Sequence, residues 1–148
     1  MRLAAPADAR WLAEWLQAAQ PLPVAAARAR HALVEGLLAR PERGACVVVQ
    51  DAEQGLLGCL PVALVPHLGL GGLAAFAAEW WARPAGAQAE PLLACCSLLA
   101  DWCQAHGVRH LLLSPALLTP PQAAAAGFVP HAGGLWHRNL SPAPKHLG

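Results

Sequence analysis

The chain of 148 residues contains few charged side chains, a single lysine and no tyrosine. Asp, Glu, Lys and Arg make up 13% of the sequence, whereas hydrophobic residues make up 56%. The arginines are scattered singly and the one lysine, Lys145, stands near the end, so the sequence offers no cluster of positive charge to bind nucleic acid. The absence of tyrosine also excludes a phenol as general acid in any reaction of this chain.

Two stretches lack Asp, Glu, Lys and Arg, namely Gln54 to Ala78 and His110 to His137, and their length raises the question of a membrane. A spanning helix needs ~20 predominantly apolar residues in one run. Glycines and prolines interrupt both stretches, which is typical of strands and turns. The sequence therefore predicts no membrane span.

The five cysteines are an odd number, and the N-terminus lacks the basic and apolar regions of a secretory signal. We therefore expect a cytoplasmic protein with reduced thiols. No Cys-x-x-Cys pair is present and no metal site is predicted. The cysteines are expected to be small buried hydrophobic residues, with Cys46 and Cys59 near each other across a hairpin. The seven histidines are expected to be ordinary surface or cleft residues.

Hydrophobic periodicity and turn residues divide the chain into four helices and six strands. Helices are expected at 6–20, 24–40, 90–106 and 122–126, and strands at 45–50, 56–65, 73–82, 109–114, 128–131 and 135–140. Two helices have a predicted apolar stripe, formed by Leu33, Val34, Leu37 and Leu38 in 24–40 and by Leu92, Cys96, Leu99 and Cys103 in 90–106. This order, ααβββαβαββ, predicts an α+β fold in which helices flank a mixed α/β sheet.

A helix between two strands of one sheet normally makes a right-handed crossover. Strands 73–82 and 109–114 are therefore expected to be parallel neighbours joined by helix 90–106. One domain is expected over residues 1–140, followed by a disordered tail at 141–148.

Three segments carry a resemblance to a known family. They are ALVEGLLARPERGACVVVQD, LGGLAAFAAEWWARP and AAAAGFVP. With their spacing, they resemble the second helix and second strand, the fourth strand, and the Gly-Phe junction of the GNAT family of N-acetyltransferases. The resemblance covers nearly the whole chain, from Asp8 to Leu140. It implies that acetyl-CoA is a co-substrate and that a small amine is the acetyl acceptor.

The resemblance also implies where the cofactor lies. GNAT proteins hold the pyrophosphate on backbone amides of an Arg/Gln-x-x-Gly-x-Gly/Ala loop at the start of a helix, where unpaired N–H groups attract an anion. The backbone just before this loop would hold the pantetheine. The implied cofactor-binding residues are Trp81, Ala82, Arg83, Gly86, Ala87, Gln88 and Ala89.

The sequence departs from the family pattern at four positions. Gln88 occupies the last small position of the loop, and Glu90 brings a negative charge to the start of the helix. The usual tyrosine of the family falls on Ala123 and its usual asparagine on Leu117. The general acid is therefore not identified.

Glu79 is the predicted catalytic base, because it is the only carboxylate between Glu53 and Glu90 and GNAT members often carry a Glu there. The alternative is a glutamate at a strand end that points to solvent. Trp80 and Trp81 follow it and are expected to point to opposite faces of the sheet.

Three functions remain open. The first is an acetyl-CoA-dependent N-acetyltransferase acting on a small amine. The second is a GNAT domain that binds a ligand or partner without catalysis. The third is an oligomerisation module. The low charge favours at least a homodimer in each case.

Overall fold

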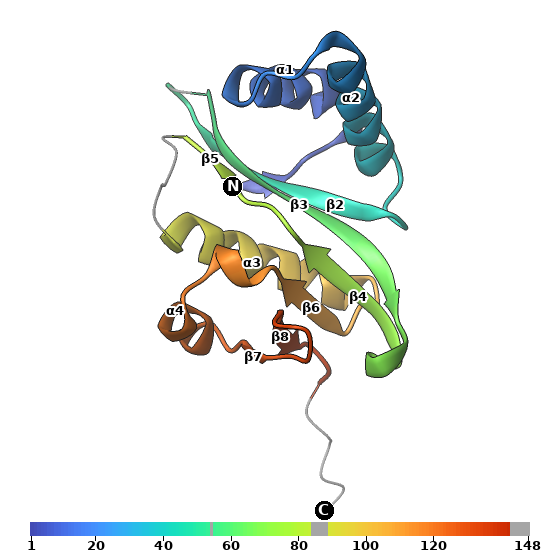
Figure 1. Cartoon of the computed structure of the whole chain (residues 1–148), viewed down its shortest axis with the longest axis vertical. Coiled ribbons are helices and arrows are strands. Elements are labelled where there is room, and N and C mark those ends of the chain that lie inside the picture. Colours follow the sequence, from blue (N-terminus) through green and yellow to red (C-terminus); the bar gives the residue numbers. More distant parts are fainter. Residues whose placement is uncertain (54, 84–88, 143–148) are drawn as a thin grey trace, which may run out of the picture.

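The computed structural model describes residues 1–53, 55–83 and 89–142. Its centre is an eight-stranded sheet with the order β1-β2-β3-β4-β6-β8-β7, and β5 pairs with β3 beside this path (Figure 1). All neighbouring strands are antiparallel except β4 and β6. The strands are β1 (Arg2–Leu3), β2 (Gly44–Asp51), β3 (Gly55–His67), β4 (Gly72–Ala77), β5 (Trp81–Ala82), β6 (His110–Leu113), β7 (Val129–Pro130) and β8 (Trp136–Asn139).

Helices cover both faces of this sheet. The four α-helices are α1 (Ala9–Ala19), α2 (Val24–Ala39), α3 (Ala89–Ala105) and α4 (Pro120–Ala125). Helices α1 and α2 pack on β2 and β3, whereas α3 packs on the opposite face (Figure 1). Alternation along β2 explains the two layers, because Val47 faces α3 while Cys46 and Val48 face α1 and α2.

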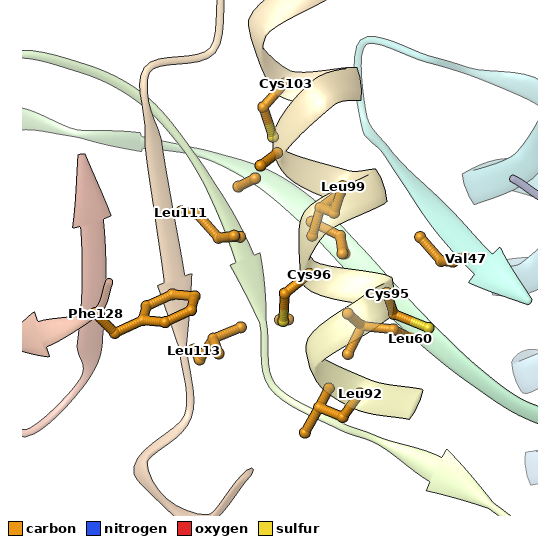
Figure 2. Close-up of a cluster of buried hydrophobic side chains, with 14 of the residues drawn as sticks. Val47, Leu60, Leu92, Cys95, Cys96, Leu99, Cys103, Leu111, Leu113 and Phe128 are labelled. Atoms are coloured by element: carbon orange, nitrogen blue, oxygen red, sulfur yellow. The ribbon is translucent and has the colours of Figure 1, made fainter. Parts of the chain in front are cut away.

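The larger core lies under α3. Figure 2 shows side chains of α3 between those of β6 and those of β2 and β3. The predicted apolar stripe of this helix is confirmed, since all of its members have a relative exposure of 0–1%. These residues are Leu92, Cys96, Leu99 and Cys103.

Local sequence signals set the helix ends. Gly107 follows α3 with a φ of +71°, a left-handed conformation that favours glycine after a helix. Thr119 and Gln122 form a capping box at α4, in which each side chain accepts a hydrogen bond from the other's backbone N–H. The end of α3 lies within one residue of the predicted end at 106, whereas α4 begins at Pro120, two residues before the predicted start at 122.

The predicted α+β fold and element order are confirmed, and so is the crossover. Ala74 pairs with His110 and Ala77 with Leu113 in a parallel ladder, and α3 joins the two strands. The short strand β1 was not predicted, because two residues carry no periodicity. Most of the predicted tail, residues 143–148, lies outside the described residues, and the single domain over 1–140 stays a prediction.

Two predictions about particular elements are wrong. The strand expected over 73–82 is divided into β4 and β5. Leu33, expected in the apolar stripe of α2, has a relative exposure of 74% and is not part of the core. Both differences occur around the candidate site described next.

Candidate functional site

The strand that precedes α3 is interrupted at the centre of the sheet. Ala63 of β3 pairs with Phe76, and Cys59 pairs with Trp81. The step from 59 to 63 is four residues, but the step from 76 to 81 is five, so one extra residue stands between β4 and β5. Such a β-bulge turns the side chains that follow it to the opposite face of the sheet.

This bulge decides where Glu79 lies. Strict alternation would place Glu79 on the same face as Ala77. Ala77 packs in the core under α3, whereas Glu79 lines a cavity on the face that α1 and α2 cover. Trp80 packs against the α3 core and Trp81 against the α1–α2 core, so the two tryptophans take opposite faces as predicted.

The cavity has a volume of about 460 Å³, within the usual range of small-molecule sites. Apolar side chains and two thiols form most of its wall, and only Gln20, Arg30 and Glu79 contribute polar side chains. Glu79 is exposed to solvent and also lines the cavity, so its carboxylate lies at the mouth. The remaining lining residues are Leu12, Leu16, Leu22, Ala26, Ala29, Leu33, Val34, Leu37, Cys46, Cys59, Pro61 and Trp81.

Arg30 is held in place at this cavity by two hydrogen bonds from one guanidinium nitrogen. Its Nη2 donates to Oε1 of Gln17 at 2.7 Å and to the backbone oxygen of Gln20 at 2.9 Å. Gln17 in turn donates from Nε2 to the backbone oxygen of Leu22 and accepts from the Leu22 backbone N–H. The connection between α1 and α2 therefore places one cation beside the cavity.

Two buried thiols, Cys46 and Cys59, line the sheet side of the cavity. A hydrogen bond with Cys46 and burial raise the pKa of the Cys59 thiol, and the negative charge of Glu79 adds to this shift. The thiol therefore stays protonated and neutral at pH 7. All five cysteines are free and buried, as predicted, and burial raises the pKa of Cys103 to about 12.

The strands also separate at the bulge. The last hydrogen bond between the two parallel segments joins the Ser114 N–H to the Ala77 oxygen at 3.0 Å. Beyond this point β5 pairs with β3, and the Arg83 N–H donates to the Leu57 oxygen at 2.7 Å. Trp80 has its indole Nε1 buried here without a hydrogen-bond partner among the residues that the structure describes. The geometry thus leaves one edge of β5 without a partner strand in the described part of the sheet, and one buried donor on the face that α3 covers.

The cofactor-binding residues implied by the resemblance are only partly described. Trp81 and Ala82 form β5, and Ala89 is the first residue of α3, with Glu90 exposed in its first turn. Gly86, Ala87 and Gln88 lie outside the described residues. Arg83 is exposed, and its guanidinium stacks on the Trp15 ring at 5.3 Å from the ring centroid.

The positions that carry tyrosine and asparagine in the GNAT pattern lie beyond β6. Ala123 of α4 is completely buried in the α3 core. Leu117 packs against the same core from the 3₁₀ turn Pro115–Leu117. Both side chains are apolar, so neither supplies a proton.

A cluster of four histidines was missed by the sequence analysis. His110 Nδ1 and His137 Nε2 form a hydrogen bond of 3.0 Å, and the ring centroid of His131 lies 5.5 Å from that of His137. His67 continues the chain at 5.2 Å from His131. These residues come from β3, β6, β8 and the turn before β8, so their spacing in the sequence carries no signal.

Burial lowers the pKa of His137, and the charges that His110, His131 and His67 would carry lower it further. Within residues 1–53, 55–83 and 89–142, no group of three or more His, Cys, Asp or Glu residues is arranged to hold a metal ion. No helix of this described part is long and apolar enough to cross a membrane.

Solved structures resemble this chain over nearly its whole length. An integron cassette protein from the Cole Harbour Salt Marsh metagenome has 24% identity and a TM-score of 0.65, covering 99% of this chain and 90% of the other. A GNAT-family acetyltransferase from Streptococcus pneumoniae has 13% identity and a TM-score of 0.66, covering 95% and 98%.

A predicted acetyltransferase from Clostridium acetobutylicum, solved with acetyl-CoA, has 11% identity and a TM-score of 0.66, covering 88% of this chain and 90% of the other. No family model matches the sequence, and no curated protein matches it. The structural similarity, together with the crossover and the separation of the two chain segments that follow β4 and β6, establishes that the chain has the GNAT fold.

Proposed function

We propose that this protein is an N-acetyltransferase that transfers an acetyl group from acetyl-CoA to a small amine, with Glu79 as the base. The observation that carries the proposal is the β-bulge between Ala77 and Trp81. It places Glu79 at the mouth of the cavity, close to the point where the two parallel segments separate.

The strand separation fits an acyl-CoA on three grounds. First, β5 pairs only with β3 in the described part of the sheet, so its other edge has backbone groups to bind the amides of pantetheine. Second, the buried Trp80 Nε1 has no partner among the described residues, and an amide oxygen would accept its hydrogen. Third, α3 begins at Ala89, and the positive end of the helix dipole attracts a phosphate there.

The residues present support a direct transfer. The Glu79 carboxylate accepts a proton from the ammonium group of the acceptor, directly or through one water. The neutral amine then attacks the thioester carbonyl, the carbon–sulfur bond breaks, and the nitrogen gives up one further proton to water as the amide forms. With no tyrosine in the chain, water protonates the departing thiolate.

A second candidate is a GNAT domain that binds a ligand without catalysis. Glu90 favours it, because this exposed carboxylate stands in the first turn of α3 where it opposes a bound phosphate. Leu117 and Ala123 favour it as well, since both replace polar residues of the GNAT pattern.

Thermal unfolding with acetyl-CoA and a thiol-release assay with amines separate these candidates. An acetyltransferase is stabilised by about 2.7 kcal/mol when the cofactor is present at about 100 times its dissociation constant. It also releases CoA only when an amine is added. Stabilisation without release for any amine would favour the binding domain. No stabilisation at millimolar acetyl-CoA would reject the acetyltransferase.

A further inference from the structure

We propose that the cavity between α1, α2 and the sheet binds a primary amine with a single positive charge and an apolar body, such as an aryl or branched alkyl group. The ammonium group lies at Glu79 and the body lies between the helices and the sheet. The statement that this amine is the acetyl acceptor rests on the proposed function. The statement that the cavity binds it does not.

The wall of the cavity matches an apolar body. Apart from Gln20, Arg30 and Glu79, its lining side chains are aliphatic, aromatic or neutral thiols. A volume of about 460 Å³ accommodates a ring with a short side arm. Burial of such a body provides affinity in proportion to the apolar area removed from water.

Leu33 supports the same conclusion at the exposed rim of the cavity. It lines the cavity, yet its relative exposure is 74%. An exposed leucine alone needs no explanation, but here it continues an apolar wall that runs inward to the buried Leu12 and Leu16. An apolar ligand would cover both the inner wall and this exposed side chain.

The charges at the cavity exclude a polyamine. Among the lining residues, Glu79 is the only carboxylate and Arg30 is a cation held by Gln17 and Gln20. A second ammonium group would find no carboxylate in this wall and would be repelled by Arg30. The protonated Cys59 thiol adds no negative charge that could offset this repulsion.

The chain offers a matched pair of variants for a test. Ala29 and Ala25 are both exposed residues of α2, but only Ala29 lines the cavity. Leucine is a good helix former, so either alanine can be replaced without breaking the helix. Ala29→Leu narrows the cavity, and Ala25→Leu adds the same group to the same helix elsewhere.

Binding is measured first, by calorimetry with 2-phenylethylamine, 2-phenylethanol, ethylamine and spermidine. We expect 2-phenylethylamine to bind at least tenfold more tightly than each of the others, because only it has both an apolar body and a single ammonium group. Ala29→Leu should weaken this binding at least tenfold, whereas Ala25→Leu should leave it unchanged. In Glu79→Gln, the advantage of the amine over the alcohol should disappear.

Equal or tighter binding of spermidine would overturn the inference, and so would an unchanged affinity in Ala29→Leu. The thiol-release assay then tests the acceptor role with the same amines. If 2-phenylethylamine binds as expected but no amine releases CoA, the cavity assignment holds and the acetyltransferase fails. If spermidine is acetylated faster than 2-phenylethylamine, the acceptor assignment is wrong although the enzyme function stands.

Discussion

The two faces of the central sheet are packed very differently. Under α3, the side chains of the helix and of β6 are almost completely buried, and they form one continuous core (Figure 2). Under α1 and α2, a smaller core is interrupted by a cavity of about 460 Å³ with an exposed leucine beside it. The first face is closely packed, and the second leaves part of its apolar surface uncovered.

The difference between the two faces of the sheet also accounts for the low charge of this chain. A covered face needs apolar residues for packing, and an apolar cavity needs them again for binding. Alanine is suited to both purposes, because its small apolar side chain packs in the core and leaves space at the cavity, where Ala26 and Ala29 are lining residues. The homodimer expected from the low charge stays a prediction, and the variants below also bear on it.

The largest effect is expected from a pair of leucines, one on each face. Leu99→Ala removes a completely buried side chain of α3 and should lower the free energy of unfolding by about 2–5 kcal/mol. Leu33→Ala removes an exposed side chain and should change it by less than about 0.5 kcal/mol. Urea unfolding of the parent and both variants measures these values.

If Leu33→Ala lowered the free energy of unfolding by more than about 2 kcal/mol, the face under α1 and α2 would not be the more open of the two. It would mean that this side chain is buried in solution, as in a dimer that covers α2. Light scattering at high micromolar concentration, where a dimer has twice the monomer mass, would then decide between a dimer and a rearranged helix.

The second largest effect is expected on turnover, when the proposed base Glu79 is replaced. Glu79→Gln keeps the shape of the side chain but cannot accept a proton, so kcat for an accepted amine should fall by about 10²-fold or more. The proposed base acts on the acceptor amine and not on the cofactor, so the affinity for acetyl-CoA should stay within about twofold. Glu42→Gln, an exposed glutamate that does not line the cavity, is the matched control. Steady-state kinetics and calorimetry with acetyl-CoA measure the two quantities.

An unchanged kcat in Glu79→Gln would leave the cavity without a catalytic role. An equal loss in Glu42→Gln would show that the effect is not specific to the cavity.

The third effect concerns the histidines on the half of the sheet that α1 and α2 do not cover. The folded state lowers the pKa of His137, so below the unfolded pKa of about 6.5 the unfolded chain binds more protons. The free energy of unfolding is therefore highest above about pH 6.5, where His137 is neutral in both states, and it decreases as the pH falls from there through the folded pKa. Around His137, the side chains whose positive charge would oppose its protonation are His110, His131 and His67.

Urea unfolding at pH 7.5 and pH 5.5 measures this loss of stability. His137→Gln should reduce it, because glutamine does not titrate. His106→Gln, outside the cluster, should retain the loss of the parent chain. A loss in His137→Gln equal to that of the parent would show that the cluster does not control the response to pH.

The sequence was sufficient to predict the four α-helices and the longer strands in their order, because each of these elements carries its own periodicity or turn residues, whereas β1 and the division between β4 and β5 were missed. Helix α3 shows this best, with its predicted stripe completely buried. The crossover between β4 and β6 was also predictable, because its handedness and length follow general rules. Glu79 was identified as a candidate from its isolation among apolar residues and from the resemblance.

The site itself could not be predicted, because it depends on pairing between distant strands. The bulge is visible only when β3 is aligned with β4 and β5, and strict alternation would have turned Glu79 toward α3. The histidine cluster depends on pairing in the same way, since Leu112 must pair with His137 before His110 and His137 meet. Leu33 continued the helical stripe but faces a cavity, which periodicity cannot distinguish from a core.

The smallest effect is expected at the start of α3. Glu90 is exposed in the first turn, where its negative charge stabilises the helix dipole but opposes a phosphate bound at the same end. Glu90→Gln should therefore tighten acetyl-CoA binding by about 0.3–1 kcal/mol, the usual size of such a charge–dipole interaction. The gain should shrink as salt is raised, because exposed charges are screened. Calorimetry at two salt concentrations measures both changes, with Glu42→Gln as control. Binding that is weakened by Glu90→Gln would mean that the phosphates do not lie at this helix end, and acetyl-CoA would then need another position on the sheet.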